Sequence, residues 1–374
     1  MRVLHICSYY LSSNLFFKLF QNLDSIGVES TVFVPLSHND REYWDRSEDK
    51  RQHVDIARFL SASDRFLYHQ KAYKVFHYLE THYDLTQYDC IHAHSLFTNG
   101  LVAQLIYKKY KIPYIVALRN TDLNFFFKYF FIYRKDGIQI MRDAKRVIFL
   151  SESYKERTFK KYVPDMNRQE IASHCEVIPN GIDDFWLNNK QERINPIGTE
   201  LKIINVGSIG KNKNQLLVAK AVRKLNENGT PASFTVVGDI TDYNYCNKLK
   251  MVLPEIDILP FMRKECLIDC YRSHNFFVMT SYKETFGLVY AEAMSQGLPV
   301  IYSKGEGFDR QFPEGTVGYS VDPMSVEDLV TKIQMIINNY NRLAENCLKY
   351  CELFNWRKLA KKYKAIYEEC LTIS

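Results

Sequence analysis

The sequence predicts an α/β protein with two consecutive domains, each built on a parallel sheet that helices cover. The chain has 374 residues, and single hydrophobic cores stop growing beyond about 250–300 residues, so two domains are expected. Short apolar runs typical of buried strands alternate with longer runs typical of helices, in two series along the chain. The polar stretch 188–200 lies between the two series and is a candidate linker.

The first series occupies the N-terminal half of the chain. VLHIC (3–7) is a candidate strand, and NLFFKLFQNLDSIG (14–27) is a candidate helix that ends at a glycine. Residues 37–88 are charged, aromatic and irregularly patterned, and we expect extra helices there. The other expected elements are strands at 30–35, 90–94, 113–118, 146–150 and 175–179 and a helix at 99–111.

The second series follows the linker. A helix is expected over 214–229, and the last fifty residues are expected to be mostly helical. The expected strands are 201–207, 233–239, 257–260, 275–281 and 298–303. Open sheets of this kind bind ligands at the carboxyl ends of their strands, so we expect a ligand between the two domains.

The composition is that of a soluble globular protein. Hydrophobic residues make up 46% and charged residues 25% of the chain. No run approaches the roughly 18 uncharged apolar residues of a membrane helix, and the apolar run at the N-terminus is too short for a signal peptide. The nine cysteines include no C-x-x-C pair, which argues against structural zinc. We therefore expect a cytoplasmic protein with reduced thiols.

Positive charge and aromatic side chains concentrate in one part of the first domain. Residues 101–161 contain fourteen Lys or Arg against five Asp or Glu, which suits a negatively charged partner; no nucleic-acid motif accompanies this charge. Within it, seven of the twelve residues of NFFFKYFFIYRK (124–135) are aromatic. This mixture is favoured at anionic membrane surfaces, although a helix packed against its own domain explains the pattern equally well.

Two glutamates in KETFGLVYAEAMSQGLPVI (283–301) raise the question of a catalytic pair. If 284–292 were one helix, Glu284 and Glu292 would lie roughly 12 Å apart, which is longer than the roughly 5–9.5 Å of glycosidase carboxylates. The spacing suits two ends of an extended ligand such as a nucleotide sugar, with Gly287 and a helix N-terminus near its diphosphate. An amphipathic helix with two solvated glutamates is the alternative.

The same stretch resembles the E-x7-E signature of the retaining glycosyltransferases of family 4, which adopt the two-domain GT-B fold. Other segments resemble the family in the same order over most of the chain: HAHS (92–95), VIPNGID (177–183), VGSIGKNKN (206–214), AEAMSQGLPVI (291–301) and FNWRKLAKKYKAIY (354–367). The resemblance implies an acceptor-binding domain at 1–185 and a nucleotide-sugar-binding domain at 186–353. A terminal helix, about 354–374, would cross back to the first domain.

The resemblance also implies roles for single residues. Glu284 would face the donor sugar, Glu292 would hold the ribose hydroxyls, and Lys213 would neutralise the leaving diphosphate, whose charge grows in the transition state. The implied catalytic residues are Glu284, Lys213, Arg119 and Asp122. The implied donor-binding residues are Glu292, Thr285, Phe286, Gly287, Leu288, Gly207, Ser208, Lys211, Ser12 and Ser13.

The sequence departs from the family pattern at three places. Ser208 stands where the family commonly has a second cationic residue, and Lys211 is the candidate substitute. Ser12, Ser13 and Asn14 replace a glycine-rich turn, so a hydroxyl or a helix N-cap must serve instead. Arg119 replaces a histidine that touches the donor sugar; either a substrate carries an anion there or Arg119 pairs with Asp122.

His92 and His94 form an H-x-H pattern that could suggest a metal site. We expect their side chains to point to opposite faces of the strand, which disfavours joint ligation, and no compelling D-x-D motif is present. The resemblance likewise implies no metal and no cofactor, only a UDP- or GDP-linked sugar as co-substrate.

The resulting prediction is a retaining hexosyltransferase that acts on a saccharide hydroxyl. The acceptor is expected to be lipid-linked, in the assembly of a bacterial capsule or O-antigen, with the enzyme peripheral at the inner face of the membrane. The alternatives are a sugar-nucleotide epimerase of the same fold and a degenerate transferase that only binds sugar nucleotides.

Overall fold

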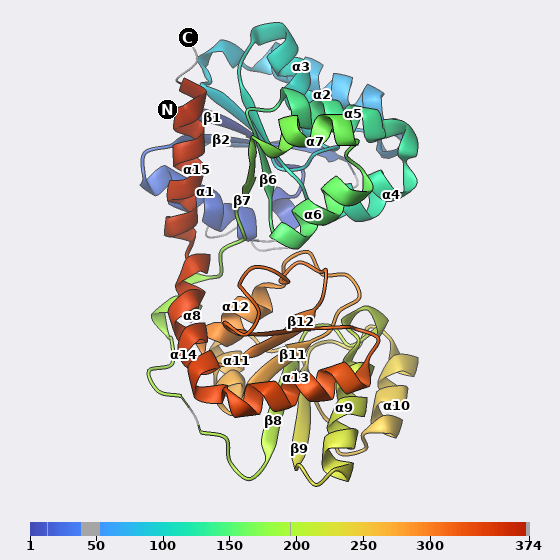
Figure 1. Ribbon diagram of the computed structural model, residues 1–374. Coiled ribbons are helices and arrows are strands. Elements are labelled where there is room, and N and C mark those ends of the chain that lie inside the picture. Colours follow the sequence, from blue (N-terminus) through green and yellow to red (C-terminus); the bar gives the residue numbers. More distant parts are fainter. Residues whose placement is uncertain (13, 39–52, 195, 372–374) are drawn as a thin grey trace. The chain divides into compact units, whose positions relative to one another are not determined.

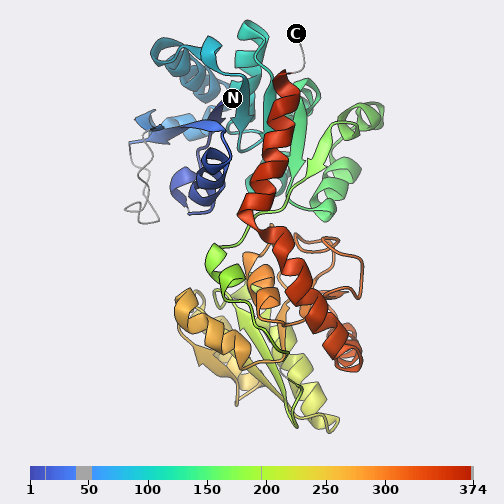
Figure 2. The same cartoon turned by 90° about the vertical axis from the view of Figure 1, so that its left-hand side faces the viewer.

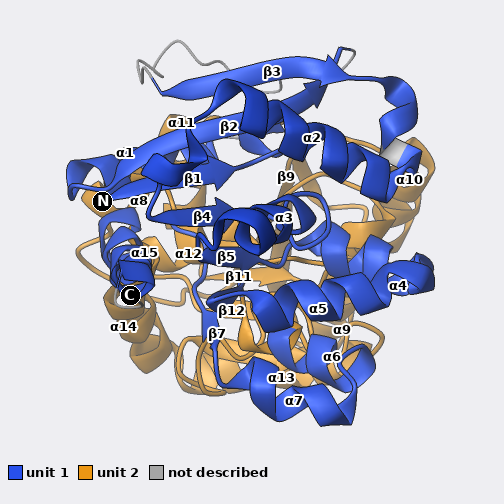
Figure 3. Ribbon diagram, turned by 90° about the horizontal axis from the view of Figure 1, so that it is seen from above, with its two compact units in different colours: residues 1–150, 155–181, 356–374 blue, residues 151–154, 182–355 orange. Residues whose placement is uncertain are grey.

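The computed structural model describes residues 1–12, 14–38, 53–194 and 196–371. The chain divides into two compact units, shown in blue and orange in Figure 3. Unit 1 comprises residues 1–150, 155–181 and 356–374, and unit 2 comprises residues 151–154 and 182–355. The boundary predicted after residue 185 thus lies four residues beyond the end of unit 1 at Gly181.

Unit 1 is built on a seven-stranded parallel sheet with strand order β3-β2-β1-β4-β5-β6-β7. Figure 1 labels β1, β2, β6 and β7 of this sheet. All residues of β4 are buried, as expected for a parallel strand covered on both faces. The strands are β1 (Arg2–Ile6), β2 (Glu29–Ser37), β3 (Val54–Leu60), β4 (Cys90–Ala93), β5 (Tyr114–Ala117), β6 (Arg146–Phe149) and β7 (Cys175–Val177). The helices are α1 (Leu15–Ser25), α2 (Tyr68–His82), α3 (Gly100–Tyr110), α4 (Phe127–Tyr129), α5 (Arg134–Asp143), α6 (Glu152–Lys161), α7 (Asp165–Ala172) and α15 (Trp356–Leu371).

Unit 2 contains a six-stranded parallel sheet with strand order β10-β9-β8-β11-β12-β13. The strands are β8 (Leu201–Val206), β9 (Ala232–Val237), β10 (Asp257–Leu259), β11 (Phe276–Met279), β12 (Val300–Ser303) and β13 (Gly318–Val321). The helices are α8 (Asp184–Asn188), α9 (Gln215–Glu227), α10 (Tyr243–Val252), α11 (Lys264–Arg272), α12 (Leu288–Ser295), α13 (Val326–Asn338) and α14 (Tyr340–Tyr350). The predicted architecture of two Rossmann-like domains is therefore confirmed, while the ligand expected between them stays a prediction.

The C-terminal helix α15 belongs to unit 1, and Figure 2 shows it as a long red helix against that unit. It packs beside α1, and its apolar residues Trp356, Leu359 and Tyr367 join the same core as Val3 and Ile115 of the sheet. The predicted return of the C-terminus to the first domain thus has a physical basis, because α15 covers apolar sheet surface that would otherwise contact water.

Two strands of the structure, β3 and β13, are not among those predicted from the sequence. Residues 37–88 were expected to hold extra helices, and they do contain α2, but they also contain β3, which lies at the edge of the sheet. No strand was predicted at Gly318–Val321, which forms β13 at an edge of the unit 2 sheet. Residues 39–52 lie outside the described part of the chain. None of the helices in the described ranges is both long and apolar enough to cross a bilayer.

Short 3₁₀ or π segments connect several elements: Tyr10–Ser12, Ala62–Phe66, Leu85–Gln87, Asp122–Phe126, Phe131–Tyr133, Lys211–Lys213 and Cys351–Phe354. Three of them carry predicted site residues: Ser12 ends the first segment, Asp122 begins the π segment, and Lys211 and Lys213 begin and end the 3₁₀ segment after β8.

The contact between Gly181 and Trp356 leads to the first prediction. A Cβ at residue 181 would lie 2.4 Å from Cδ2 of the buried Trp356 indole, so Gly181→Ala must displace α15 or its tryptophan. Overpacking of this kind costs about 1–3 kcal/mol, and we expect the thermal midpoint to fall by a few degrees. Gly198→Ala is the matched control, because a Cβ there meets no atom within 4 Å. An equal midpoint for both variants would contradict this packing.

Candidate functional site

The site in unit 2 lies where the winding of its sheet reverses. From β8 the chain continues to β9 and β10 on one side, and then returns to β11 on the other side of β8. After β8 and β11 the chain therefore continues in opposite directions across the sheet, and open parallel sheets bind their ligands at such a point. The predicted residues of this unit come from these two loops and the helix α12.

The two loops are joined by an ion pair between predicted catalytic residues. Nζ of Lys213 lies 2.6 Å from Oε2 of Glu284, and both side chains are mostly buried, with exposed fractions of 22% and 15%. The other oxygen of Glu284 accepts a hydrogen bond from the backbone N–H of Thr285 at 3.2 Å. A charge-assisted bond in this setting is stronger than one between exposed groups. The structure thus brings together two side chains that are 71 residues apart in the chain.

Hydrogen bonds hold the backbones of the two loops against each other. The N–H of Tyr282 donates to the carbonyl of Asn212 at 2.9 Å, and the Asn212 side chain donates to the carbonyl of Lys283 at 3.1 Å. Asn214 has a left-handed conformation with φ of 55°, which asparagine tolerates better than most residues. These contacts fix the position of Lys213 before any ligand arrives.

Glycines allow close backbone approach around this ion pair. A Cβ at Gly307 would lie 2.0 Å from the carbonyl oxygen of Thr285, and the N–H of Gly307 donates to the carbonyl of Glu284 at 2.8 Å. Gly287 has φ of 76° and is the N-cap of α12, so the backbone turns into the helix through a conformation that L side chains rarely adopt. A Cβ at Gly207 would lie 3.3 Å from Cε of Lys213.

Glu292 lies inside α12, where its carboxyl group is poorly solvated. Burial and the charge of Asp183 raise the pKa of Glu292, while Tyr271, Lys264 and Trp186 lower it, and the resulting pKa is about 7. Ligand hydroxyls that donate hydrogen bonds to this carboxyl group would favour its charged form. The group is therefore well suited to bind them.

The remaining predicted residues of unit 2 differ in accessibility. Phe286 is buried and packs against Phe308 and Phe354, so only its backbone can meet a ligand. Thr285 and Leu288 are partly exposed. Ser208 and Lys211 are exposed, and the Ser208 carbonyl accepts from the Gln215 side chain at 3.0 Å.

A cavity of about 400 Å³ lies in unit 1 at the carboxyl ends of β1 and β2. Hydroxyl groups of Ser8, Tyr9, Ser12, Thr98 and Thr121 line it together with the aromatic rings of Tyr68, Phe125 and Phe126. The Ser12 hydroxyl donates to the Tyr9 carbonyl at 2.6 Å. Ser13 lies outside the described residues, and Asn14 begins α1 without a side-chain cap.

Asp122 and Arg119 lie at the end of β5 in unit 1. The Asp122 carboxylate is fully buried and accepts from the backbone N–H groups of Leu96, Phe97 and Arg119 at 3.0, 3.0 and 2.8 Å. Burial raises the pKa of Asp122 to about 6, and these backbone donors oppose the rise. Asp122 therefore acts on the backbone of two loops as a positioning residue.

The expectation that the side chains of His92 and His94 point to opposite faces of their strand is wrong. Residues two apart on a strand share a face, and the two rings stack with centroids 3.9 Å apart. Together with His5 they form a fully buried group in which one nitrogen of each ring lies within 4.8 Å of the other two. Burial lowers the pKa of His92 and His94 well below the ordinary value, so both rings are neutral.

Hydrogen bonds engage one nitrogen of each ring in this histidine group, while Nε2 of His92 and Nδ1 of His94 are buried without a hydrogen-bond partner among the described residues. Nδ1 of His5 lies 3.1 Å from Nε2 of His94, and Nδ1 of His92 lies 2.7 Å from the Tyr367 hydroxyl on α15. The cluster therefore ties β1 and β4 to the C-terminal helix. Although the donor set is one that metals use, the nearby charge of Arg119 opposes a cation there.

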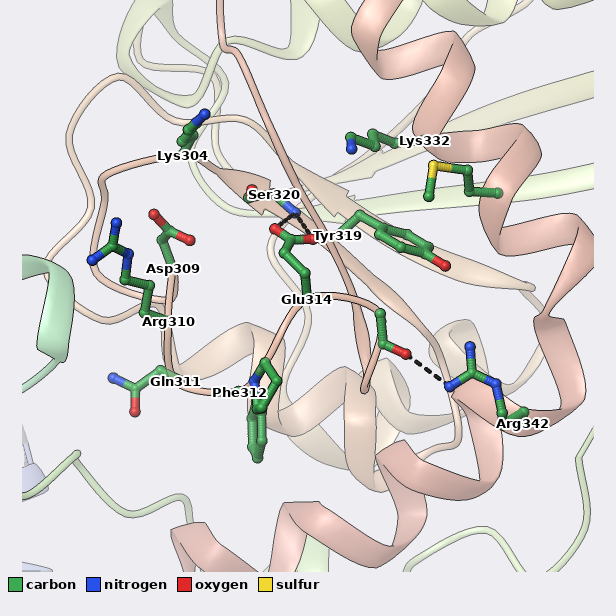
Figure 4. Close-up of a pocket in the computed structure, with 13 residues that line it drawn as sticks. Lys304, Asp309, Arg310, Gln311, Phe312, Glu314, Tyr319, Ser320, Lys332 and Arg342 are labelled. Carbon is green, nitrogen blue, oxygen red and sulfur yellow. Dashed lines mark hydrogen bonds between the residues drawn. The ribbon is translucent and has the colours of Figure 1, made fainter.

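A cavity of about 940 Å³ in unit 2 lies along the edge strand β13 (Figure 4). Lys304 and Lys332 lie on either side of Glu314, whose carboxylate accepts from the N–H of Ser320 at 2.8 Å. The Arg342 guanidinium donates to the Gly315 carbonyl at 2.9 Å. These polar groups protect the sheet edge, and the cavity contains none of the predicted site residues.

Two family models match consecutive parts of the chain. The model described as Glycosyltransferase Family 4 matches residues 13–184, and the model described as Glycosyl transferases group 1 matches residues 188–352. Together they span most of both units.

The chain is a group 1, family 4 glycosyltransferase.

Relatives of this glycosyltransferase agree with the assignment. It is 25% identical to an uncharacterised glycosyltransferase of Methanocaldococcus jannaschii, over 75% of each chain. It is 26% identical, again over 75% of each chain, to an Escherichia coli enzyme named UDP-Gal:alpha-D-GlcNAc-diphosphoundecaprenol alpha-1,3-galactosyltransferase. Its fold is similar to that of sucrose-phosphate synthase from Thermosynechococcus elongatus, with a TM-score of 0.72, 18% identity and full coverage of both chains.

Sequence reasoning missed several groups at the glycosyltransferase site. Glu306 accepts from the N–H of Glu284 at 2.8 Å through its carboxylate, and Asp183 forms an ion pair of 3.0 Å with Lys264 beside Glu292. The glycines on both sides of Glu306, directly after a buried strand, are a signal that could have found it.

The raised pKa of Glu292 leads to a prediction of pH-dependent stability. Glu292 holds its proton more tightly in the folded protein, with a pKa of about 7 against an ordinary 4.5. The free energy of unfolding therefore falls as pH rises from 4.5 to 7, and above pH 7 the total loss is about 3 kcal/mol. Glu292→Gln should raise the thermal midpoint at pH 8 and leave it unchanged near pH 4.5. A variant no more stable than wild type at pH 8 would show that the carboxyl group is well solvated.

Proposed function

We propose that this glycosyltransferase moves a hexose from a nucleotide-sugar donor to a saccharide hydroxyl with retention of anomeric configuration. The observation that carries the proposal is the ion pair of Lys213 and Glu284, held at the reversal point of the unit 2 sheet at 2.6 Å. It places a fixed cation and a carboxylate side by side where an open parallel sheet binds its ligand.

The cation and the carboxylate suit the two reacting parts of such a donor. A departing nucleoside diphosphate gains negative charge, and a preorganised ammonium group such as Lys213 stabilises that charge in the transition state. Glu284 can accept hydrogen bonds from sugar hydroxyls. The proposed donor is linked to UDP or GDP, and neither a metal nor another cofactor is part of the proposal.

The geometry of Glu284 supports a role in sugar recognition rather than covalent catalysis. Both of its oxygens are already engaged, one by Lys213 and the other by the N–H of Thr285. A carboxylate stabilised in this way is a weaker nucleophile. In the proposed retaining course the donor phosphate accepts the proton of the attacking hydroxyl, so no enzymic carboxylate forms a glycosyl adduct.

Glu292 is proposed to bind the ribose of the donor. Its pKa of about 7 means that it is close to half ionised in the free protein at neutral pH. Hydroxyls that donate to the carboxylate favour the charged form, so donor binding would release part of a proton. Phe286, Gly287 and Leu288 would contribute backbone groups at the start of α12.

The cavity in unit 1 suits a saccharide acceptor. Its hydroxyl groups can exchange hydrogen bonds with sugar hydroxyls, and its aromatic rings can pack against a sugar face. The E. coli relative is named for an acceptor on diphosphoundecaprenol. By analogy the proposed acceptor is lipid-linked, in the assembly of a bacterial surface polysaccharide such as a capsule or O-antigen.

An exposed aromatic and basic segment supports contact with the membrane that would hold such an acceptor. In residues 124–135 the buried Phe127 anchors the segment, while Phe131 and Ile132 are 70% and 63% exposed. Lys128 and Lys135 are exposed beside them. The buried Phe127 agrees with packing against its own domain, and the exposed part is proposed to lie on the anionic inner leaflet.

Substitution of Lys213 tests the transferase proposal. Lys213→Ala should lower kcat by about 10²–10³, as loss of one transition-state donor does, with a smaller change in KM. Lys220→Ala, which removes an exposed charge on α9, should keep wild-type kinetics. The assay follows labelled UDP- and GDP-sugars. Isomerised donor without an acceptor would instead indicate the epimerase, and binding without turnover would indicate a degenerate subunit.

Vesicle binding tests the membrane contact. Wild-type enzyme should float with vesicles that contain anionic phosphatidylglycerol and less with neutral phosphatidylcholine, and added salt should weaken binding. Phe131→Ser with Ile132→Ser should reduce flotation. Met251→Ser, which removes an apolar side chain of unit 2 that is 81% exposed, is the control. Failure of wild type to bind anionic vesicles at low salt would assign the segment to another role.

A further inference from the structure

Arg119 is a mostly buried cation at the carboxyl end of β5 in unit 1. Its side chain is only 9% exposed. The guanidinium carbon lies 5.2 Å from the centroid of the Phe16 ring, on α1. Arginine is always charged and is rarely buried without a compensating group, so its partners indicate what the position is built to hold.

No carboxylate among the residues that the structure describes forms an ion pair with this guanidinium. The Nε–H of Arg119 donates to the backbone carbonyl of His94 at 3.1 Å, and Nη1 lies 3.5 Å from the Asn180 side-chain oxygen. A guanidinium has five N–H donors; these two bonds leave Nη2 and the second hydrogen of Nη1. This end of the fork is the edge that binds a carboxylate or phosphate through two parallel hydrogen bonds.

Asp122 does not fill that role, although it is the nearest predicted partner. It bonds the backbone N–H of Arg119 rather than the side chain, and its oxygens also receive the N–H groups of Leu96 and Phe97. The pairing of Arg119 with Asp122 considered from the sequence is therefore a backbone hydrogen bond and a longer-range attraction between the two charges, without a side-chain ion pair. The carboxylate fixes the loop that carries Arg119 and leaves its guanidinium edge for another anion.

The other ionisable groups around Arg119 do not supply a negative charge. His92 and His94 are buried and neutral, and the charge of Arg119 helps to keep them so. Burial also raises the pKa of the Tyr9 and Tyr363 hydroxyls, which keeps both protonated. Tyr9 lines the hydroxyl-rich cavity of unit 1 and bonds Thr121 at 2.7 Å, so the cation lies close to the cavity wall.

We propose that Arg119 binds an anionic group, a carboxylate or a phosphate, on the saccharide that this glycosyltransferase handles. The inference rests on the proposed function and adds a substrate class to it: a uronic or phosphorylated sugar. The anion belongs either to the transferred sugar of the donor or to the acceptor, and the chemistry of recognition is the same in both. Arg119 is thus a specificity-determining residue.

The test compares ligand pairs that differ in charge. The donor arm measures Kd for UDP-glucuronate against UDP-glucose and for GDP-mannuronate against GDP-mannose. The acceptor arm measures Kd for glucose 6-phosphate and glucuronate against glucose. In at least one arm the anionic member should bind wild type about 10- to 100-fold more tightly, as expected for charge-assisted hydrogen bonds in a poorly solvated site.

Variants at Arg119 test whether this residue causes the tighter binding of the anionic ligand. Arg119→Gln should bring the ratio close to one, and Arg119→Lys should keep only part of it because an ammonium cannot form the fork. Arg168→Gln is the control: its Nε also donates to a carbonyl, and its ion pair is on the surface. Thermal midpoints check folding, and if Arg119→Gln does not fold, Arg119→Lys decides the test.

The outcomes separate this inference from the proposed function. Absence of any anionic preference in both arms, or a preference that Arg119→Gln retains, would overturn the role of Arg119 even if the enzyme transfers neutral sugars. Conversely, a wild type that transfers no sugar from any donor contradicts the proposed function. The free-sugar arm would still report on Arg119 in that case, because it needs no turnover.

Discussion

The ion pair of Lys213 and Glu284 depends on one constraint, which is that every strand of a parallel sheet ends at the same edge. The loops after β8 and β11 therefore meet, and hydrogen bonds between their backbones hold the two charges 2.6 Å apart. Close packing of Gly307 on Thr285 requires glycine at that point. A ligand with a diphosphate and sugar hydroxyls can then compete for charges that are already positioned, with little reorganisation.

Strong local patterns made most of the fold predictable. The apolar run at 201–207 became β8, and the amphipathic run at 214–229 became α9, because burial on both faces of a strand and on one face of a helix leaves distinct periodicities. Edge strands leave weaker signals. β3 lies in a charged region, and β13 is only four residues long and starts with a glycine. Pairing with a neighbouring strand, rather than local preference, therefore determines that these segments are strands.

The site was predictable in its residue types but not in its contacts. Lys213 and Glu284 were identified from a family resemblance, yet nothing local shows that residues 71 apart form an ion pair. His92 and His94 share a face, contrary to the prediction, because side chains alternate at every residue of a strand and positions two apart point the same way. Only the structure shows that the guanidinium of Arg119 lacks an ion pair with Asp122, because the Asp122 carboxylate accepts hydrogen bonds from three backbone N–H groups.

Hydrogen exchange with bound nucleotide tests the central claim most directly. Amide exchange of the whole enzyme is compared with and without saturating UDP or GDP. The account predicts slower exchange in three segments after β8, β11 and β12, namely 207–214, 282–293 and 304–309. Protection confined to residues 310–320, beside the cavity of Figure 4, would place the nucleotide elsewhere and contradict the account.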